Sequence, residues 1–250
     1  MDGFIKEKLK LKQFQAFDKI MLLWVGICLV FWLFFIIIFE FIFQFLYFFV
    51  WILCFGTFFW INKDFIKEKL RSWKVNSFFK FLIIGVGMVL LEEIFAALFN
   101  HLSEGFSFNL FLLRILQFWL FNVIVFTPWF IIWFILLKKF KYSVREVFYL
   151  AGICGLIFES IFFLLFLNPL GFLFITPLVI FTYGILIFPS VMGLEEECLS
   201  KKKINIFLKY VLSIIAPVLC SILISGIIIG TFRPIYPELF PPEKFGFSYQ

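Results

Sequence analysis

The feature that most limits the fold is a succession of long apolar runs separated by short polar segments. A helix needs about 20 apolar residues to cross the roughly 30 Å of bilayer hydrocarbon. Runs of this kind cover residues 78–99, 109–137, 147–167, 172–192 and 206–229. Hydrophobic residues make up 64% of the chain and charged residues 15%, whereas soluble domains have about 45–50% and about 25%. The sequence therefore predicts an all-α, polytopic integral membrane protein.

The apolar stretch from Ile20 to Asn62 is too long for a single span. At about 1.5 Å per residue it would extend roughly 60 Å, which is twice the thickness of the hydrocarbon. Its only polar break runs from Glu40 to Gln44, so we predict two spans joined there. Together with the later runs, this gives about seven transmembrane helices. They form one predicted domain over residues 20–230, between a basic segment (1–19) and a Pro-rich tail (231–250).

Basic residues are distributed unevenly among the loops of this arrangement. Cytoplasmic loops of membrane proteins are enriched in Lys and Arg. With a cytoplasmic N-terminus, 19 of the 22 basic residues fall in the N-terminal segment and in the loops on the same side. Arg233 and Lys244 fall on the other side, and Arg114 lies within a span. We therefore predict a multi-pass protein of the cell membrane with an extracytoplasmic C-terminus.

Net charge and cysteine content bear on the partners of the chain. The formal net charge is +6, and a basic balance can indicate nucleic-acid binding. Here the Lys and Arg residues form short clusters beside apolar runs, which is typical of membrane orientation. We therefore expect the lipid bilayer, and no nucleic acid, as a partner. The five cysteines have no CxxC spacing, so the sequence suggests neither a zinc site nor a disulfide framework.

Four ionisable side chains fall within the predicted spans: Glu92, Glu93, Arg114 and Glu159. Each costs about 2.5–3.5 kcal/mol on insertion scales and therefore requires a partner or a function. Measured from the nearest polar end of its span, Glu93 lies about 10 Å deep, Arg114 about 8 Å and Glu159 about 13 Å. These depths belong to the outer half of the bilayer. Because short connections favour neighbouring helices, we predict one charged cluster reached from the extracytoplasmic face.

Other polar side chains lie near this set and are candidate accessory groups: Asn100, His101, Gln117, Asn122 and Tyr183. His101 is either an interfacial residue or a metal ligand, and Tyr183 is either a packing residue or part of the site. Ala151, Gly155 and Glu159 recur every four residues. Small residues at this spacing let another helix approach closely, so we expect Glu159 to face a helix-lined interior.

The segment LEEIFAALFNH places Glu92 and Glu93 side by side in a membrane helix. In this respect it resembles the EExxxR element of the CAAX-protease and bacteriocin-processing family of intramembrane proteases. The resemblance covers about six residues and implies that these glutamates hold a metal or activate water, together with histidines. Ala97 stands where the family's motif has Arg, and His101 is the only histidine in the chain. The family's further histidines therefore have no counterpart.

Three functions from different classes fit these residues. The first is a carrier or channel-like protein whose charged cluster binds a cation, a proton or a small polar solute. The second is an intramembrane enzyme in which a glutamate acts as general base, with or without a metal. The third is an assembly protein in which Arg114 pairs with Glu92 or Glu93 to hold helices together. None of the three points to a particular cofactor.

The predicted cytoplasmic break from Asn62 to Ser77 combines basic and apolar residues. One interpretation is a short amphipathic helix on anionic headgroups, with its apolar side toward lipid. The residues of that side are Phe65, Ile66, Leu70 and Trp73. The other interpretation is a solvated connector between two spans.

Overall fold

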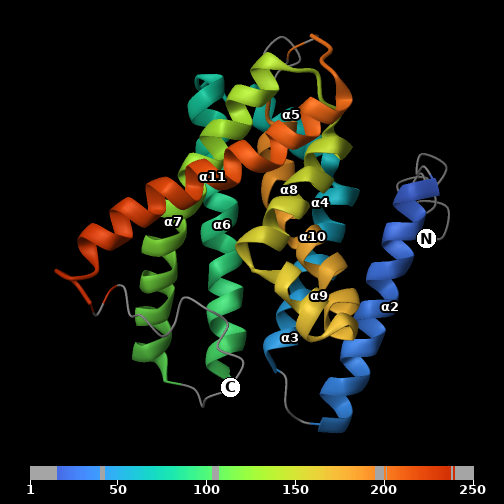
Figure 1. Cartoon of the computed structure of the whole chain (residues 1–250), viewed down its shortest axis with the longest axis vertical. Coiled ribbons are helices and arrows are strands. Elements are labelled where there is room, and N and C mark those ends of the chain that lie inside the picture. Colours follow the sequence, from blue (N-terminus) through green and yellow to red (C-terminus); the bar gives the residue numbers. More distant parts are fainter. Residues whose placement is uncertain are drawn as a thin grey trace. The chain divides into compact units, whose positions relative to one another are not determined.

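The computed structural model describes residues 16–39, 43–102, 107–194, 200, 202–237 and 239 (Figure 1). All regular secondary structure in these residues is helical. Glu40, within the predicted first turn, and the glutamates 195–197 lie outside the described residues. The helices are α2 (Ala16–Phe39), α3 (Phe43–Phe48), the π-helical η2 (Phe49–Gly56), α4 (Thr57–Ile61), α5 (Lys63–Ser72), α6 (Ser77–Leu102), α7 (Phe108–Lys139), α8 (Val144–Phe158), the 3₁₀-helical η3 (Ile161–Phe163), α9 (Leu164–Leu167), α10 (Pro169–Met192) and α11 (Ile206–Phe232).

Five of these helices are long and apolar enough to cross a membrane: α2, α6, α7, α10 and α11. Two bent pairs bring the number to seven if each pair counts as one span. The first pair is Leu46–Ile61 with α5, and the second is α8 with residues 161–167; each is bent by 71°. The expectation of a helical protein with several membrane-spanning segments is confirmed. The number of seven, the orientation and the domain limits stay predictions.

The chain divides into two compact units. Unit 1 comprises Met1–Trp73 and Val144–Gly193, and unit 2 comprises Lys74–Ser143 and Leu194–Gln250. Each unit therefore combines two segments that are distant in the sequence. In unit 1, α10 packs against α8, α2 and the helices between residues 43 and 72. In unit 2, α7 packs against both α6 and α11.

Glycines allow α8 and α10 of unit 1 to pack in close contact. A Cβ added to Gly152 would stand 2.6 Å from the backbone oxygen of Ile180. A Cβ on Gly184 of α10 would stand 2.6 Å from the ring of Phe148. Only glycine fits such distances, because carbon atoms pack at about 3.5–4.0 Å. Gly155, a member of the predicted small-residue face, also lies against α10, because a Cβ on it would stand 2.4 Å from the ring of Tyr183.

Pro177 leaves one backbone carbonyl of α10 without its helical donor, and a side chain of α2 donates to this carbonyl instead. Proline has no N–H, so the carbonyl of Leu173, four residues earlier, loses its helical donor. The indole Nε1 of Trp24 donates to this oxygen at 3.0 Å, and Cys28 Sγ lies 3.8 Å from it. A buried or lipid-facing carbonyl must be paired. This polar contact therefore sets where α2 docks on α10.

The segment 147–167 is interrupted between α8 and η3, whereas the sequence predicts one continuous span. α8 ends at Phe158, and Ser160 adopts the left-handed conformation with φ 54°. The N–H of Ser160 donates to Ile157 O at 3.0 Å, which tightens the last turn. A left-handed residue ends a helix because the next N–H no longer points along the helix axis. The usual sequence signals of such an end, Gly or Pro, are absent here.

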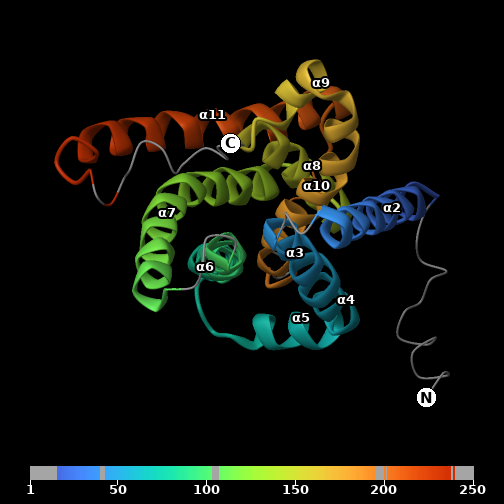
Figure 2. The ribbon, with the colours of Figure 1, turned by 90° about the horizontal axis from the view of Figure 1, so that it is seen from below.

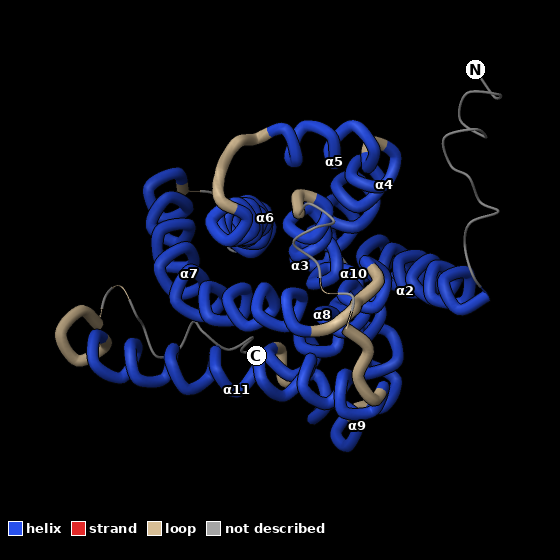
Figure 3. Tube along the Cα trace, turned by 90° about the horizontal axis from the view of Figure 1, so that it is seen from above, coloured by secondary structure: helices blue, strands red, loops and turns tan. Residues whose placement is uncertain are grey.

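Unit 2 is built around α7, which bends around α6 (Figures 2 and 3). A Cβ on Gly85 of α6 would stand 2.4 Å from the ring of Phe130 of α7, so these helices also approach at a glycine. At the far end of α7, Tyr142 and Ser213 of α11 share a hydrogen bond of 2.7 Å. The ammonium of Lys209 lies 4.9 Å from the ring centre of Tyr142. These contacts join the segment that follows α7 to the first half of α11.

Candidate functional site

The four ionisable residues that the sequence predicts at membrane depth belong to different units. Glu92, Glu93 and Arg114 lie in unit 2, on α6 and α7, whereas Glu159 lies in unit 1 beside the end of α8. The predicted joining of all four in one cluster therefore stays a prediction. Each unit presents a polar site of its own, with different chemistry.

In unit 2, polar side chains connect α6 and α7. The side-chain amide of Asn122 on α7 donates to Glu93 Oε1 on α6. One turn away, the indole Nε1 of Trp119 donates to the carbonyl of Leu90 at 2.9 Å. Hydrogen bonds between membrane helices contribute about 0.6 kcal/mol each and at most about 1.7. Glu93 and Asn122 therefore act, at the least, as an interhelical connection.

Three other members of the predicted set in unit 2 are buried. Glu92 is 8% exposed, Arg114 8% and Gln117 7%. Asn100 is half-buried near the end of α6. Glu92 on α6 and Arg114 on α7 thus place a buried anion and a buried cation on two helices that pack against each other.

His101 lies in the last turn of α6 and accepts a hydrogen bond from the residue that precedes α7. Its side chain is 1% exposed, and its Nε2 accepts a hydrogen bond of 2.7 Å from the backbone N–H of Ser107. The ring also stacks on Phe111, with 6.3 Å between the ring centres. An imidazole nitrogen that accepts a hydrogen bond has its lone pair engaged. In this conformation Nε2 is therefore occupied by the backbone.

The described part of the chain contains no group of three His, Cys, Asp or Glu side chains placed to hold a metal ion. Metal-activated hydrolysis needs about three protein ligands that converge on one point. The metal-assisted version of the enzyme hypothesis thus has no ligand set within these residues.

In unit 1, Glu159 occupies the break in the helix. Its backbone N–H still closes the last turn of α8 by donating to Gly155 O at 2.9 Å, and the next residue is the left-handed Ser160. The hydroxyl of Tyr183 on α10 donates to Glu159 Oε1 at 2.7 Å. Within unit 1, the described residues place no cationic side chain on this carboxylate. Among the described residues of unit 1, the carboxylate therefore has one neutral donor and no counter-charge.

Gly155 fixes the position of Tyr183. A Cβ at Gly155 would stand 2.4 Å from Cδ2 and Cγ of the tyrosine ring, so the ring lies directly on the glycine. The ring also stacks with Phe158, at 6.2 Å between centres. Tyr183 is 6% exposed. The sequence placed both Gly155 and Glu159 on one face, and the structure brings both of them to Tyr183.

Asp18 is a polar residue that the sequence analysis did not single out. It is 7% exposed on α2 and forms an ion pair of 3.0 Å with Arg145 of α8. The hydroxyl of Tyr149 donates to its other oxygen at 3.1 Å. The position of Asp18, one residue before Lys19, gave no signal for a partner that lies 127 residues later.

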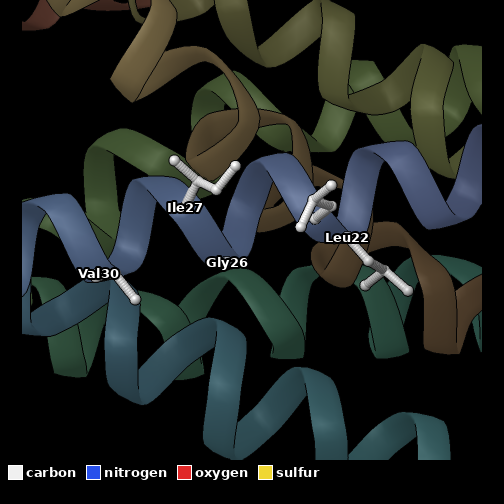
Figure 4. Close-up of a pocket in the computed structure, with 5 residues that line it drawn as sticks. Leu22, Gly26, Ile27 and Val30 are labelled. Carbon is white, nitrogen blue, oxygen red and sulfur yellow. The ribbon is translucent and has the colours of Figure 1, made fainter.

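A shallow groove on α2 is lined by apolar residues, none of which belongs to these polar groups. Figure 4 shows it around Gly26, between side chains that project from successive turns of one helix. The residues that line it are Leu22, Leu23, Gly26, Ile27 and Val30. No heavy atom lies within 4 Å of a Cβ built on Gly26. The groove suits a hydrocarbon chain and offers nothing to a charged solute.

No family model, curated protein or solved structure matches the chain. The resemblance to the CAAX-protease family therefore rests on the few residues around Glu92 and Glu93 alone. The functional argument depends on the chemistry of the polar groups.

Proposed function

We propose that the protein is a carrier or channel-like membrane protein that binds a proton, a cation or a small polar solute at a carboxylate within the membrane. Glu159 is the principal binding group in this proposal. The observation that carries it is the position of Glu159 at the break between α8 and η3, where Tyr183 donates to its carboxylate. Tyr183 orients the carboxylate without neutralising it.

The charge of Glu159 supports binding. A lone carboxylate in hydrocarbon costs several kcal/mol, and this cost disappears only when the charge is paired or neutralised. Because the described residues of unit 1 place a phenol and no cation on this carboxylate, a proton or an external cation is the natural counter-charge. A group that gains and loses this charge can couple binding to movement across the membrane.

The broken helix supports the same proposal. Interrupted helices are tolerated at membrane depth only where protein covers them or where they line a water-filled cavity. In many transporters such breaks lie at the binding site, because the ends of half-helices present backbone groups to the ion or substrate. The 71° bend beside Glu159 has this character, whereas α6 and α7 are continuous at Glu93 and Asn122.

A structural role is a second candidate, and the bond between Glu93 and Asn122 favours it for unit 2. In that case the polar residues of α6 and α7 hold helices together, and the protein serves membrane assembly. The two candidates are separable, because they concern different residues.

Infrared difference spectroscopy of the reconstituted protein tests the proposal. Titration with protons, and then with Na⁺ or K⁺, should change the carboxyl stretching bands, and Glu159→Gln should remove this change. Glu93→Gln, which keeps a side-chain oxygen as acceptor, serves as the matched control and should retain the change. Proteoliposomes loaded with a pH-sensitive dye should show a pH-dependent flux in the wild type and none with Glu159→Gln. Wild-type titration and flux in Glu159→Gln would overturn the proposal.

A further inference from the structure

The segment that follows α7 and the segment that precedes α11 lie side by side in unit 2 (Figure 1). The backbone N–H of Lys141 donates to Lys202 O at 2.9 Å, and the backbone N–H of Ser200 donates to Leu137 O at 3.0 Å. The hydroxyl of Ser200 also donates to Lys139 O at 3.0 Å, although these two residues are 61 positions apart in the sequence. Backbone hydrogen bonds therefore fix the two segments against each other.

This pairing brings exposed lysines together at one end of α7 and α11. We refer to five of them as the lysine platform: Lys138, Lys139, Lys141, Lys202 and Lys203. No described residue forms an ion pair with any of their ammonium groups. Lys138 lies 5.4 Å from the ring centre of Phe134, a contact that leaves its charge unbalanced. The acidic residues that the structure describes in unit 2 are Glu92 and Glu93, in the second half of α6. The platform is thus a concentration of positive charge without a described counter-charge.

The helix ends explain only part of this charge. Cations are favourable at the C-terminal end of a helix and unfavourable at its N-terminal end, because of the helix dipole. Lys138 and Lys139 lie in the last turn of α7 and agree with this rule. Lys202 and Lys203 precede the N-terminal end of α11 and oppose it. Membrane orientation depends on the number of basic residues in a loop and does not require two segments to be bonded to each other. An anionic ligand that contacts both segments explains the arrangement.

Exposed apolar side chains lie next to the platform. In the first turn of α11, Ile206 is 63% exposed and Phe207 is 75% exposed. On α7, Ile135 is exposed one turn before the lysines. Both helices are long and apolar enough to cross a membrane, so the change from lysines to apolar residues marks the edge of the hydrocarbon. A ligand that matches this surface has an anionic head and an apolar tail.

We propose that the lysine platform binds the anionic headgroup of a phospholipid, with the acyl chains along the exposed apolar residues of α7 and α11. Clusters of about four to eight Lys or Arg residues beside a membrane-spanning helix are typical of anionic lipid sites, and each such residue strengthens binding about fivefold. The adjacent apolar residues select a lipid over a soluble anion. This inference goes beyond the proposed function, because it concerns unit 2 and needs no ligand at Glu159.

Native mass spectrometry of the full-length protein in a nonionic detergent tests the proposal. The protein is titrated with phosphatidylglycerol or with phosphatidylcholine of the same acyl chains, and the dissociation constant of the first bound lipid is measured. We expect phosphatidylglycerol to bind at least tenfold more tightly. Equal binding of the two lipids would overturn the proposal. Displacement of phosphatidylglycerol by an equal concentration of inorganic phosphate would also overturn it, because the site would then take a soluble anion.

Two pairs of substitutions show whether the platform carries the preference. Lys141→Gln with Lys202→Gln removes two charges and leaves the backbone bond between these residues in place. Because each charge contributes about fivefold, phosphatidylglycerol should bind about 25-fold more weakly, and phosphatidylcholine should bind as before. Lys139→Gln with Lys203→Gln should act in the same way, so the result does not depend on the folding of one variant. A wild-type preference for phosphatidylglycerol in both pairs would overturn the proposal.

Three controls separate the platform from other sources of charge. Lys141→Arg with Lys202→Arg keeps both charges and should keep the preference. Lys69→Gln with Lys74→Gln removes two exposed lysines elsewhere on the chain and should bind both lipids like the wild type. An equal loss in this control would mean that net charge, and not the platform, attracts the lipid, and would overturn the proposal. The same holds if the preference emerges only after glutamates 195–197 are replaced by Gln, because acidic residues of the chain would then occupy the lysines.

Discussion

Replacement of Gly155 by alanine tests the geometry that holds Glu159. The new Cβ would stand 2.4 Å from Tyr183 Cδ2, whereas carbon atoms pack at about 3.5–4.0 Å. The ring of Tyr183 must therefore move by about 1 Å, or α8 and α10 must separate. Overpacking of this kind costs about 1–3 kcal/mol. Because the hydroxyl on the same ring donates to Glu159 Oε1 at 2.7 Å, we expect proton or cation binding to weaken together with the stability of the fold.

Thermal unfolding in detergent and the infrared titration measure both effects. Gly226→Ala is the matched control, because Gly226 is an exposed helical glycine with no heavy atom within 4 Å of an added Cβ. It should melt like the wild type or slightly higher, since alanine favours a helix over glycine. Tyr183→Leu in the Gly155→Ala background should recover stability without recovering binding. Equal melting temperatures for Gly155→Ala and Gly226→Ala would refute the tight contact.

Three further perturbations probe polar contacts elsewhere in the two units. Trp24→Phe removes the donor to Leu173 O and should lower the free energy of unfolding by about 0.5–1.5 kcal/mol. In a Pro177→Ala background, where a helical N–H can donate to that carbonyl, the loss should be smaller. An equal loss in both backgrounds would contradict the role of the proline. Asp18→Asn breaks the ion pair with Arg145, whose side chain is 37% exposed, so the free energy of unfolding should fall by about 1 kcal/mol. In a background that already carries Arg145→Gln, the same substitution should have little further effect. Additive losses in thermal melts would argue against the pair. Glu93→Leu and Asn122→Leu should show a coupling energy of about 0.6–1.7 kcal/mol in a double-mutant cycle, and a coupling near zero would remove the structural role of that bond.

The sequence predicted the long helices well, because their limits depend on one-dimensional signals. Residues 78–99 were expected as a span, and α6 runs from Ser77 to Leu102. Residues 109–137 were expected, and α7 runs from Phe108 to Lys139. In both cases polar residues stop the apolar run at its ends. Helix limits of this kind follow directly from the hydropathy of the chain.

The break at Glu159 and Ser160 could not be predicted in the same way. It contains neither Gly nor Pro. Ser160 is left-handed, its N–H donates to Ile157 O, and its own carbonyl accepts from the N–H of Phe163. The hydrogen bond between Glu159 and Tyr183 could not be predicted from the sequence either, although both residues were candidates for the site. Periodicity shows which residues share a face of one helix. It does not show which residue of another helix will lie opposite.

The two polar sites differ in the charges that surround their carboxylates, which is why we propose Glu159 as the binding group. Arg114 lies in the same unit as Glu92 and Glu93, so unit 2 contains a cation that can balance an anion at similar depth. The described residues of unit 1 place no such cation on Glu159, whose partner is the neutral hydroxyl of Tyr183. A buried negative charge must be balanced by protonation or by a bound ion. Under the proposed function, a proton or an external cation supplies the counter-charge of Glu159, and it should exchange when pH or cation concentration changes.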